Sequence, residues 1–275
     1  MGKIFTIAGK EFKDAMRNRW ILFTTVLLAV LSVTLALFGS ASAENIDASG
    51  LAITVVSLSS LSIYLIPLIA ILLSYDAIVG EAERGTLLLL LTYPVSKRSI
   101  LLGKFLGHIC ILSFAIIVGF GCAAVLLMML YGLPPLQDWL AFMQLIVSSI
   151  LLGGTFVALS YMVSCFVKER ATAAGIGLFV WIFFVLLFDL VLIAVITNFG
   201  SQLDEEIVHI IMMFNPADIY RVINLTGFEN VRMFSGLGGI TEYLSLNTAQ
   251  MMAVLAGWLF VPFVIANIFF AKKEF

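Results

Sequence analysis

Six long apolar segments constrain this chain more than any other feature of its sequence. Each has about 20 or more residues with few charges, the length that a helix needs to cross roughly 30 Å of hydrocarbon. The segments cover residues 20–40, 51–74, 100–131, 139–167, 171–197 and 248–271. Only helices fit, because isolated strands would leave backbone groups unpaired in lipid. We predict an all-α integral membrane protein with six transmembrane helices, a single domain over residues 1–275.

The composition supports this class and excludes others. Of 275 residues, 62% are hydrophobic and only 12% are charged, which is more apolar surface than a soluble core can bury. The net charge of -2 provides no basic patch for nucleic acid. Lipid is therefore the expected surrounding of most of the chain.

The positions of the cations predict the orientation. Of the 15 lysines and arginines, all but Arg221 and Arg232 lie before the first segment, after the last, in the connections that follow the second and fourth, or, in the case of Lys104, near the start of the third segment. Lysine and arginine are enriched in cytoplasmic loops. Both termini are therefore predicted in the cytoplasm, and residues 198–247 on the opposite side.

Residues 1–19 have the spacing of an amphipathic helix that lies along the cytoplasmic interface. The apolar face contains Ile4, Phe5, Ala8, Phe12, Ala15 and Met16, and the polar face Lys3, Lys10, Lys13, Asp14 and Arg17. A frayed basic tail is the alternative. Gly103 and Gly107, and likewise Ala171 and Gly175, are small residues at a spacing that permits close helix packing, although this motif is common.

Residues 76–99 are the most informative cytoplasmic segment. Five leucines from Leu87 to Leu91 follow Glu81, Glu83 and Arg84, and they precede Pro94, Lys97 and Arg98. Five residues cannot span a bilayer. We expect a short helix that hides its apolar face against another protein or against the inner surface of the bundle.

Residues 198–247 are too long for a simple turn and predict a small helical cap before the last span. Asn215 precedes Pro216, which suits a capping side chain before a proline at the first helical position, and Gly227 offers a stop. The face formed by Ile219, Tyr220, Ile223 and Leu225 needs a cover. That cover is either a partner protein or the outer ends of the chain's own spans.

Asp189 is the one acid well inside a span. An aspartate near the centre of a transmembrane helix costs on the order of 2.5–3.5 kcal/mol, so it should face a partner or water. One interpretation is a hydrogen bond to Ser, Tyr or backbone of a neighbouring helix. A proton relay or a substrate contact is the other.

No catalytic pattern occurs in the sequence, so an enzyme is not expected. G-x-x-x-x-G-K-[ST], H-E-x-x-H and G-x-S-x-G are all absent. The three cysteines, Cys110, Cys122 and Cys165, form no C-x-x-C pair and are interpreted as small buried hydrophobes. His209, Met212 and Met213 would share a helical face suited to Cu(I), but methionine is also a common filler of apolar helices.

Several stretches together resemble a known family. They are residues 75–85, 91–94, 100–104, 118–124, 188–192 and 215–221. With the N-terminal helix and the six spans, they resemble permeases of ABC-2 type transporters, which have the type V exporter architecture. The resemblance narrows to permeases that assist copper-site assembly of nitrous oxide reductase during denitrification.

The resemblance implies a homodimer in the bacterial inner membrane. Its implied partners are a cytoplasmic ATPase dimer, which holds ATP and Mg²⁺, and a right-handed β-helix protein in the periplasm. A copper chaperone and nitrous oxide reductase would be served indirectly, and the chain itself would bind no cofactor. What crosses the membrane stays open among a sulfur species, a copper species and a conformational signal.

Carried over residue by residue, the resemblance places two functional surfaces. The segment that couples to the ATPase would contain Glu81, Glu83, Arg84, Gly85, Thr86, Pro94, Lys97 and Arg98. The surface for the periplasmic partner would contain Asn215, Pro216, Asp218, Tyr220 and Arg221. An ABC-2 exporter of another small substrate and a stand-alone secondary transporter are the rival functions.

Overall fold

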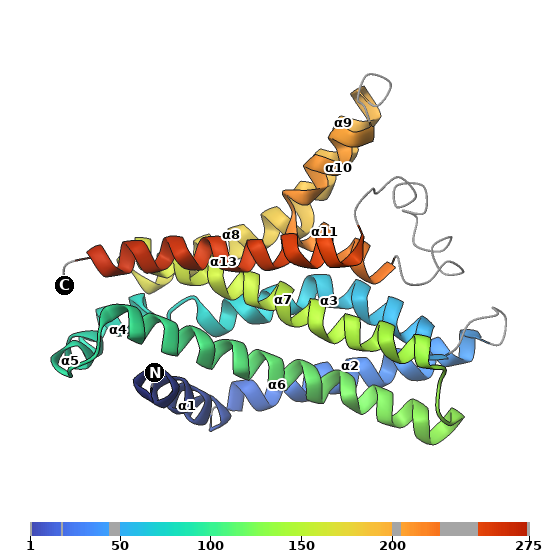
Figure 1. Ribbon diagram of the computed structural model, residues 1–275, viewed down its shortest axis with the longest axis horizontal. Coiled ribbons are helices and arrows are strands. Elements are labelled where there is room, and N and C mark those ends of the chain that lie inside the picture. The colour runs from blue at the N-terminus through green and yellow to red at the C-terminus, as the bar shows by residue number, and fades with distance from the viewer. Residues whose placement is uncertain (1, 18, 44–49, 200–204, 226–246, 274–275) are drawn as a thin grey trace.

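The computed structural model describes residues 2–17, 19–43, 50–199, 205–225 and 247–273, and the regular structure in these ranges is helical (Figure 1). Within the described ranges, six helices are long and apolar enough to cross a membrane, which confirms the predicted number of spans. They are α2 (Arg19–Ala43), α3 (Gly50–Ser74), α6 (Lys97–Tyr131), α7 (Leu136–Phe166), the continuous helix α8–η1–α9 (Arg170–Ile182, Phe183–Leu187, Phe188–Phe199) and α13 (Thr248–Lys272).

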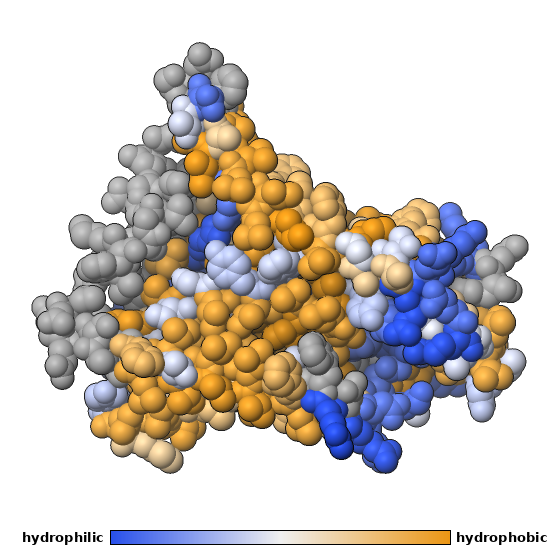
Figure 2. Space-filling model, turned by 180° about the vertical axis from the view of Figure 1, so that it is seen from behind, coloured by the Kyte–Doolittle hydropathy of each residue, from blue (hydrophilic) through white to orange (hydrophobic). Residues whose placement is uncertain are grey.

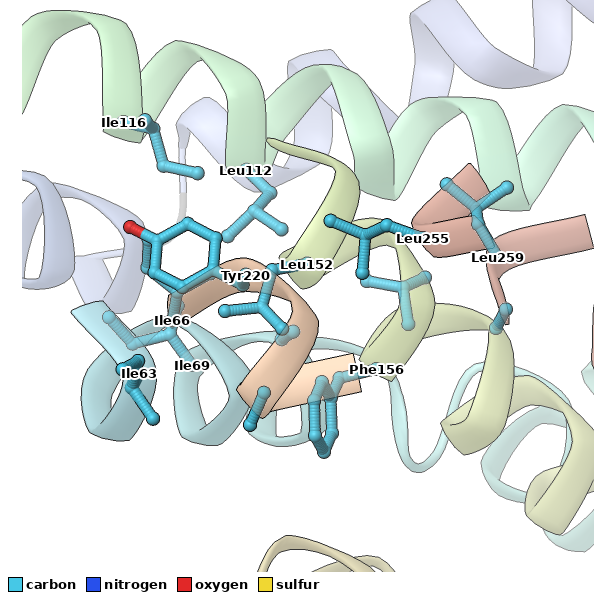
Figure 3. Packing of buried hydrophobic residues seen from close by; sticks show 14 of the residues in the cluster. Ile63, Ile66, Ile69, Leu112, Ile116, Leu152, Phe156, Tyr220, Leu255 and Leu259 are labelled. Atoms are coloured by element: carbon cyan, nitrogen blue, oxygen red, sulfur yellow. The ribbon is translucent and has the colours of Figure 1, made fainter. Parts of the chain in front are cut away.

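Helix α7 is the centre of the bundle and packs against α3, α6 and α13. A Cβ atom on Gly153 would lie 2.3 Å from Leu112 of α6, and one on Gly154 would lie 2.5 Å from Leu259 of α13. These glycines therefore let two neighbours approach the backbone of α7 from different sides. Figure 3 shows the apolar side chains that fill the space around Leu152.

Helix α6 is longer than a bilayer requires. It has 35 residues, about 52 Å at 1.5 Å per residue, whereas the hydrocarbon core is about 30 Å thick. It begins at Lys97, where the Ser96 hydroxyl accepts a hydrogen bond from the Ser99 amide at 3.2 Å. Because Lys97, Arg98 and Lys104 lie in its first turns, this end is the one that extends beyond the apolar region.

The fifth span is broken within its length. Residues Phe183–Leu187 form a π-helical segment, η1, between α8 and α9. Beyond it α9 turns away from the bundle, and α10 (Glu205–Met213) projects on the same side (Figure 1). Helix α11 (Pro216–Leu225) then packs against α3, α7 and α13.

One end of the bundle carries the short helices and most of the charge. Figure 1 places α1 (Gly2–Met16), α4 (Val79–Glu83), α5 (Thr86–Thr92) and the last turn of α13 at this end. Figure 2 shows hydrophilic side chains gathered there, beside a broad hydrophobic belt. We refer to this end as the charged end. The position of α1 at a membrane surface stays a prediction.

Candidate functional site

The segment that we expected to couple to an ATPase lies at the charged end as two short helices joined by a turn. Gly85 lies between α4 and α5 with φ +71°, a left-handed conformation that glycine adopts without strain. Lys3 of α1 donates a hydrogen bond to the Pro94 carbonyl. Lys97 donates one to the Lys273 carbonyl at 2.6 Å. The segment is thus tied to both ends of the chain.

Glu81 faces inward, into a buried ionic cluster. The Lys104 ammonium of α6 lies 2.7 Å from Glu81 Oε1 and 2.8 Å from Glu11 Oε1 of α1, and the Lys104 side chain is only 4% exposed. Burial by itself raises the pKa of Glu11. The charge of Lys104, its hydrogen bond and the charges of His108 and Lys10 together outweigh burial and hold that pKa below its ordinary value of 4.5. Both carboxylates are therefore held by one cation.

A second set of polar contacts fixes α4 to α7 and α8. Arg170 Nη2 donates to Asp76 Oδ2 at 2.7 Å, and the Arg170 amide donates to Glu83 Oε1 at 2.8 Å. The Ser164 hydroxyl of α7 accepts hydrogen bonds from the amides of Ile78 and Val79. These bonds satisfy backbone groups that a helix of five residues leaves without intrahelical partners.

The opposite face of the segment is exposed. Five of the eight residues carried over from the family are exposed, namely Glu83, Arg84, Thr86, Pro94 and Arg98, although Glu83 also accepts the hydrogen bond from the Arg170 amide. Leu87 is buried, whereas Leu88, Leu89 and Tyr93 are exposed. We define Arg84, Leu88, Leu89, Tyr93 and Arg98 as the outer face. The outer face therefore combines exposed apolar side chains with charged ones.

Sequence reasoning missed part of this arrangement. It treated Lys104 only as a cytoplasmic cation and did not connect it to Glu11, and it did not separate the leucines by exposure. One signal was present, because a lysine between Gly103 and Gly107 inside an apolar run needs a charged partner.

A second polar cluster lies where α11 meets the fifth span. Arg221 donates from Nη2 to Asp189 Oδ2 at 2.9 Å and from Nη1 to Asp218 Oδ1 at 2.8 Å. Asn215 Nδ2 donates to Asp218 Oδ2 at 2.9 Å and to the Phe184 carbonyl of η1 at 3.0 Å. Asp189 therefore has an arginine partner, rather than the Ser, Tyr or backbone partner that we expected.

Asp218 lies on α11, outside the six spans, and its pKa is shifted strongly. Burial, followed by the neighbouring Asp189 carboxylate, raises the pKa of Asp218 to about 7, although Arg221 opposes the shift. Two carboxylates thus compete for a single guanidinium.

Helix α11 has the predicted start. The Asn215 side-chain oxygen accepts a hydrogen bond from the Ala217 amide at 3.0 Å, and Pro216 occupies the first helical position. The predicted stop at Gly227 lies outside the described residues.

The apolar face of α11 is buried within the chain. Ile219, Tyr220, Ile223 and Leu225 pack into the core, and the Tyr220 hydroxyl lies 2.9 Å from the Ser149 hydroxyl of α7. Of the two covers that the sequence left open, a partner protein or the chain's own spans, the structure therefore has the chain's own helices. Four of the five residues expected to dock a periplasmic partner are buried, namely Asn215, Pro216, Asp218 and Tyr220. The fifth, Arg221, is half-buried. Their docking role stays a prediction.

The sulfur residues do not form a cluster in the part of the chain that the structure describes. Cys165 is buried as expected, but Cys110 and Cys122 are exposed, so the prediction of burial is wrong for those two. Both are apolar enough to face lipid, and an apolar sequence does not distinguish a lipid-facing position from a buried one. Met212 is buried and Met213 half-buried, and the His209 side chain lies outside the described residues. No group of three or more His, Cys, Asp or Glu side chains suited to a metal occurs within the described ranges.

The fold and the sequence together define a class of protein. A family model described as ABC-2 family transporter protein matches residues 5–275, and the chain belongs to this family. It is therefore a permease component of an ABC transporter, a transport protein rather than an enzyme.

Two relatives narrow the comparison. One from Stutzerimonas stutzeri and one from Pseudomonas aeruginosa both bear the name "Probable ABC transporter permease protein NosY". Each is 42% identical to this chain, and the match covers 99% of this chain and 99% of the relative.

Proposed function

We propose that this permease receives energy from a separate cytoplasmic ATPase that docks on the outer face of the segment 76–99. The observation that carries the proposal is the division of this segment into two faces. Its inner face is fixed by Glu81 and Leu87, whereas its outer face presents Leu88 and Leu89, both largely exposed. A short element that is anchored inside and apolar outside suits the transfer of force from a partner.

The ATP site belongs to the partner in this proposal. The sequence lacks G-x-x-x-x-G-K-[ST], the loop whose backbone amides cradle nucleotide phosphates. ATP and Mg²⁺ would therefore bind to the ATPase, and the permease would hold no cofactor itself.

The biological role that we propose is assistance in copper-site assembly of nitrous oxide reductase. The names of the two relatives support it, together with the resemblance of the motif stretches. The permease would act as a homodimer in the bacterial inner membrane, with both termini cytoplasmic. Its partners would be a NosF-like ATPase dimer and a NosD-like β-helix protein in the periplasm, and a copper chaperone and the reductase would be served indirectly.

The test of docking is a charge reversal on the outer face, Arg84→Glu with Arg98→Glu. Glu81, in contrast, is a poor probe, because reversing it would place a second cation against Lys104. We expect the double variant to bind the ATPase at least about tenfold more weakly, since losing interface anchors costs on the order of 1–2 kcal/mol or more. Co-purification of tagged permease from detergent measures this.

Lys272→Glu is the matched control, because Lys272 is exposed at the same end of the molecule but lies outside the segment. It should leave binding unchanged. Equal recovery of ATPase with the double variant and the control, both inserted normally, would place the docking surface elsewhere.

A second test uses cells that lack the ATPase. The function that we propose predicts no reductase maturation in those cells, whereas a stand-alone secondary transporter, the rival function named from the sequence, would still support it.

A further inference from the structure

Lys104 connects three elements that are far apart in the sequence. It lies in the first turns of α6, and its ammonium contacts Glu11 of α1 at 2.8 Å and Glu81 of α4 at 2.7 Å. The two acids are also largely buried, with side chains 18% and 15% exposed. One cation of a spanning helix thus holds both cytoplasmic helices.

Two glycines of α6, Gly103 and Gly107, allow α1 to approach closely enough for this contact. A Cβ on Gly103 would lie 2.8 Å from Ile7 Cβ, and one on Gly107 would lie 2.7 Å from Glu11 Cβ. Both distances are too short for any other residue without a shift of α1. Gly175, by contrast, has no atom within 4 Å of such a Cβ. The first glycine pair, and not Gly175, therefore seats a helix close enough for Glu11 to reach Lys104.

Separation of the three helices is unfavourable for an electrostatic reason. Withdrawing Lys104 would leave two carboxylates close together where little water reaches them, and charges in such places are stable only when paired. Glu81 Oε2 already has no hydrogen-bond partner among the described residues, so Lys104 is the cation on which this carboxylate depends.

We infer that Lys104 is a positioning residue for energy coupling, which binds α1, α4 and the inner end of α6 into one rigid unit. This inference rests on the proposed function. A displacement of α4 by the ATPase would then move α6, and α6 continues to the far side of the bundle. The ATPase would act on the outer face, and the contact between Lys104 and Glu81 would transmit the movement of α4 to α6.

The test uses the full permease in complex with its ATPase, with Lys104→Met as the main variant and Lys104→Arg as the conservative one. We expect Lys104→Met to retain bound ATPase but to lose the change in ATP hydrolysis rate that binding to the permease produces. Lys104→Arg should restore that change. A lysine with only a structural role would leave the hydrolysis rate of the assembled complex unaffected.

A second measurement needs no ATPase. Spin labels on Gly9→Cys of α1 and Leu89→Cys of α5, both exposed positions, report the distance between the two helices. The labels are placed in a background with Cys110, Cys122 and Cys165 changed to Ser. We expect a narrow distribution in the parent, a broadened one in Lys104→Met and in Glu11→Gln, and a narrow one again in Lys104→Arg.

Asp14→Asn is the matched control, because Asp14 lies on the same helix but is exposed and, within the described ranges, pairs only with Lys10, at 3.9 Å. It should leave the distribution narrow. Glu11→Gln keeps the pair of Lys104 with Glu81, so it remains informative if Lys104→Met does not fold. A narrow distribution in Glu11→Gln would overturn the inference. Failure of the parent permease to bind any ATPase, with the label results as expected, would instead contradict the proposed function.

Discussion

Two carboxylates share one guanidinium where α11 meets the fifth span, and this arrangement has a consequence for pH. The pKa of Asp218 is raised from 3.8 to about 7 by burial and by Asp189. Because the folded state binds the proton more tightly than the unfolded chain, the protonated form stabilises the fold. That contribution is complete below the unfolded pKa and is lost as the pH rises through about 7.

We therefore predict that the permease becomes less stable as the pH rises from roughly 4 to 7, by at most about 1.4 kcal/mol per pH unit for one proton, and that this loss levels off above about pH 7. Thermal unfolding in detergent measures the change. Asp218→Asn should flatten this dependence, since the amide does not titrate, and Asp14→Asn should preserve it. An equal pH dependence in the parent and in Asp218→Asn would show that another group titrates.

At the scale of single residues, the sequence located the important charges but not their partners. Asp189 and Glu81 were singled out from position alone. Their partners, Arg221 and Lys104, lie 32 residues from Asp189 and 23 residues from Glu81 along the chain. Only the packing of α11 and of α6 brings each pair together, and no local pattern encodes that packing.

At the scale of elements, the bend of the fifth span depends on a contact from outside it. The π-helical segment Phe183–Leu187 contains neither Gly nor Pro, the usual causes of a sharp bend. The Phe184 carbonyl instead accepts a hydrogen bond from Asn215 Nδ2. Because the same Asn215 also caps α11, one side chain fixes both the bend and the start of the next packed helix.

Asn215→Ala should therefore destabilise the fold by about 1–2 kcal/mol, the usual cost of losing a cap and a buried hydrogen bond. We also expect faster hydrogen exchange in η1 and α11 than in the parent. Asn198→Ala is a suitable control, because Asn198 is exposed and donates a hydrogen bond to the Ala194 carbonyl of its own helix. Exchange that increased equally in both variants would mean that Asn215 has no special role in the bend.

Elements with a clear pattern were predictable, and those shaped by distant contacts were not. Hydrophobic length located the spans, and Asn215 with Pro216 located the start of α11. The bend at η1 has no signal in its own residues. The burial of α11 was undecided as well, because an apolar face is satisfied equally by a partner or by the chain's own helices.

At the scale of the whole molecule, the sequence predicted six spans and one charged end, but not which faces pack. In a soluble protein, the apolar residues of a helix show which face is buried, whereas a membrane-spanning helix is apolar on all sides. The exposure of Cys110 and Cys122 could not be predicted for this reason. The same holds for the fifth span, because only 11% of its most apolar window is buried. Small residues were a partial guide, since Gly103 and Gly107 mark close contacts and Gly175 does not. Gly153 and Gly154, which mark two of the closest contacts among the described residues, were not singled out from the sequence.

The central claim is that an ATPase docks at the charged end, on the outer face. Leu89 lies there with 64% of its surface exposed, and Leu133 lies just beyond the opposite end of α6 with 86% exposed. A photo-crosslinking amino acid at either position, in cells that make the whole transporter, reports which end contacts the ATPase. We predict a crosslinked product of permease and ATPase from position 89 and none from position 133. A product from position 133 alone would contradict both the docking surface and the orientation of the chain.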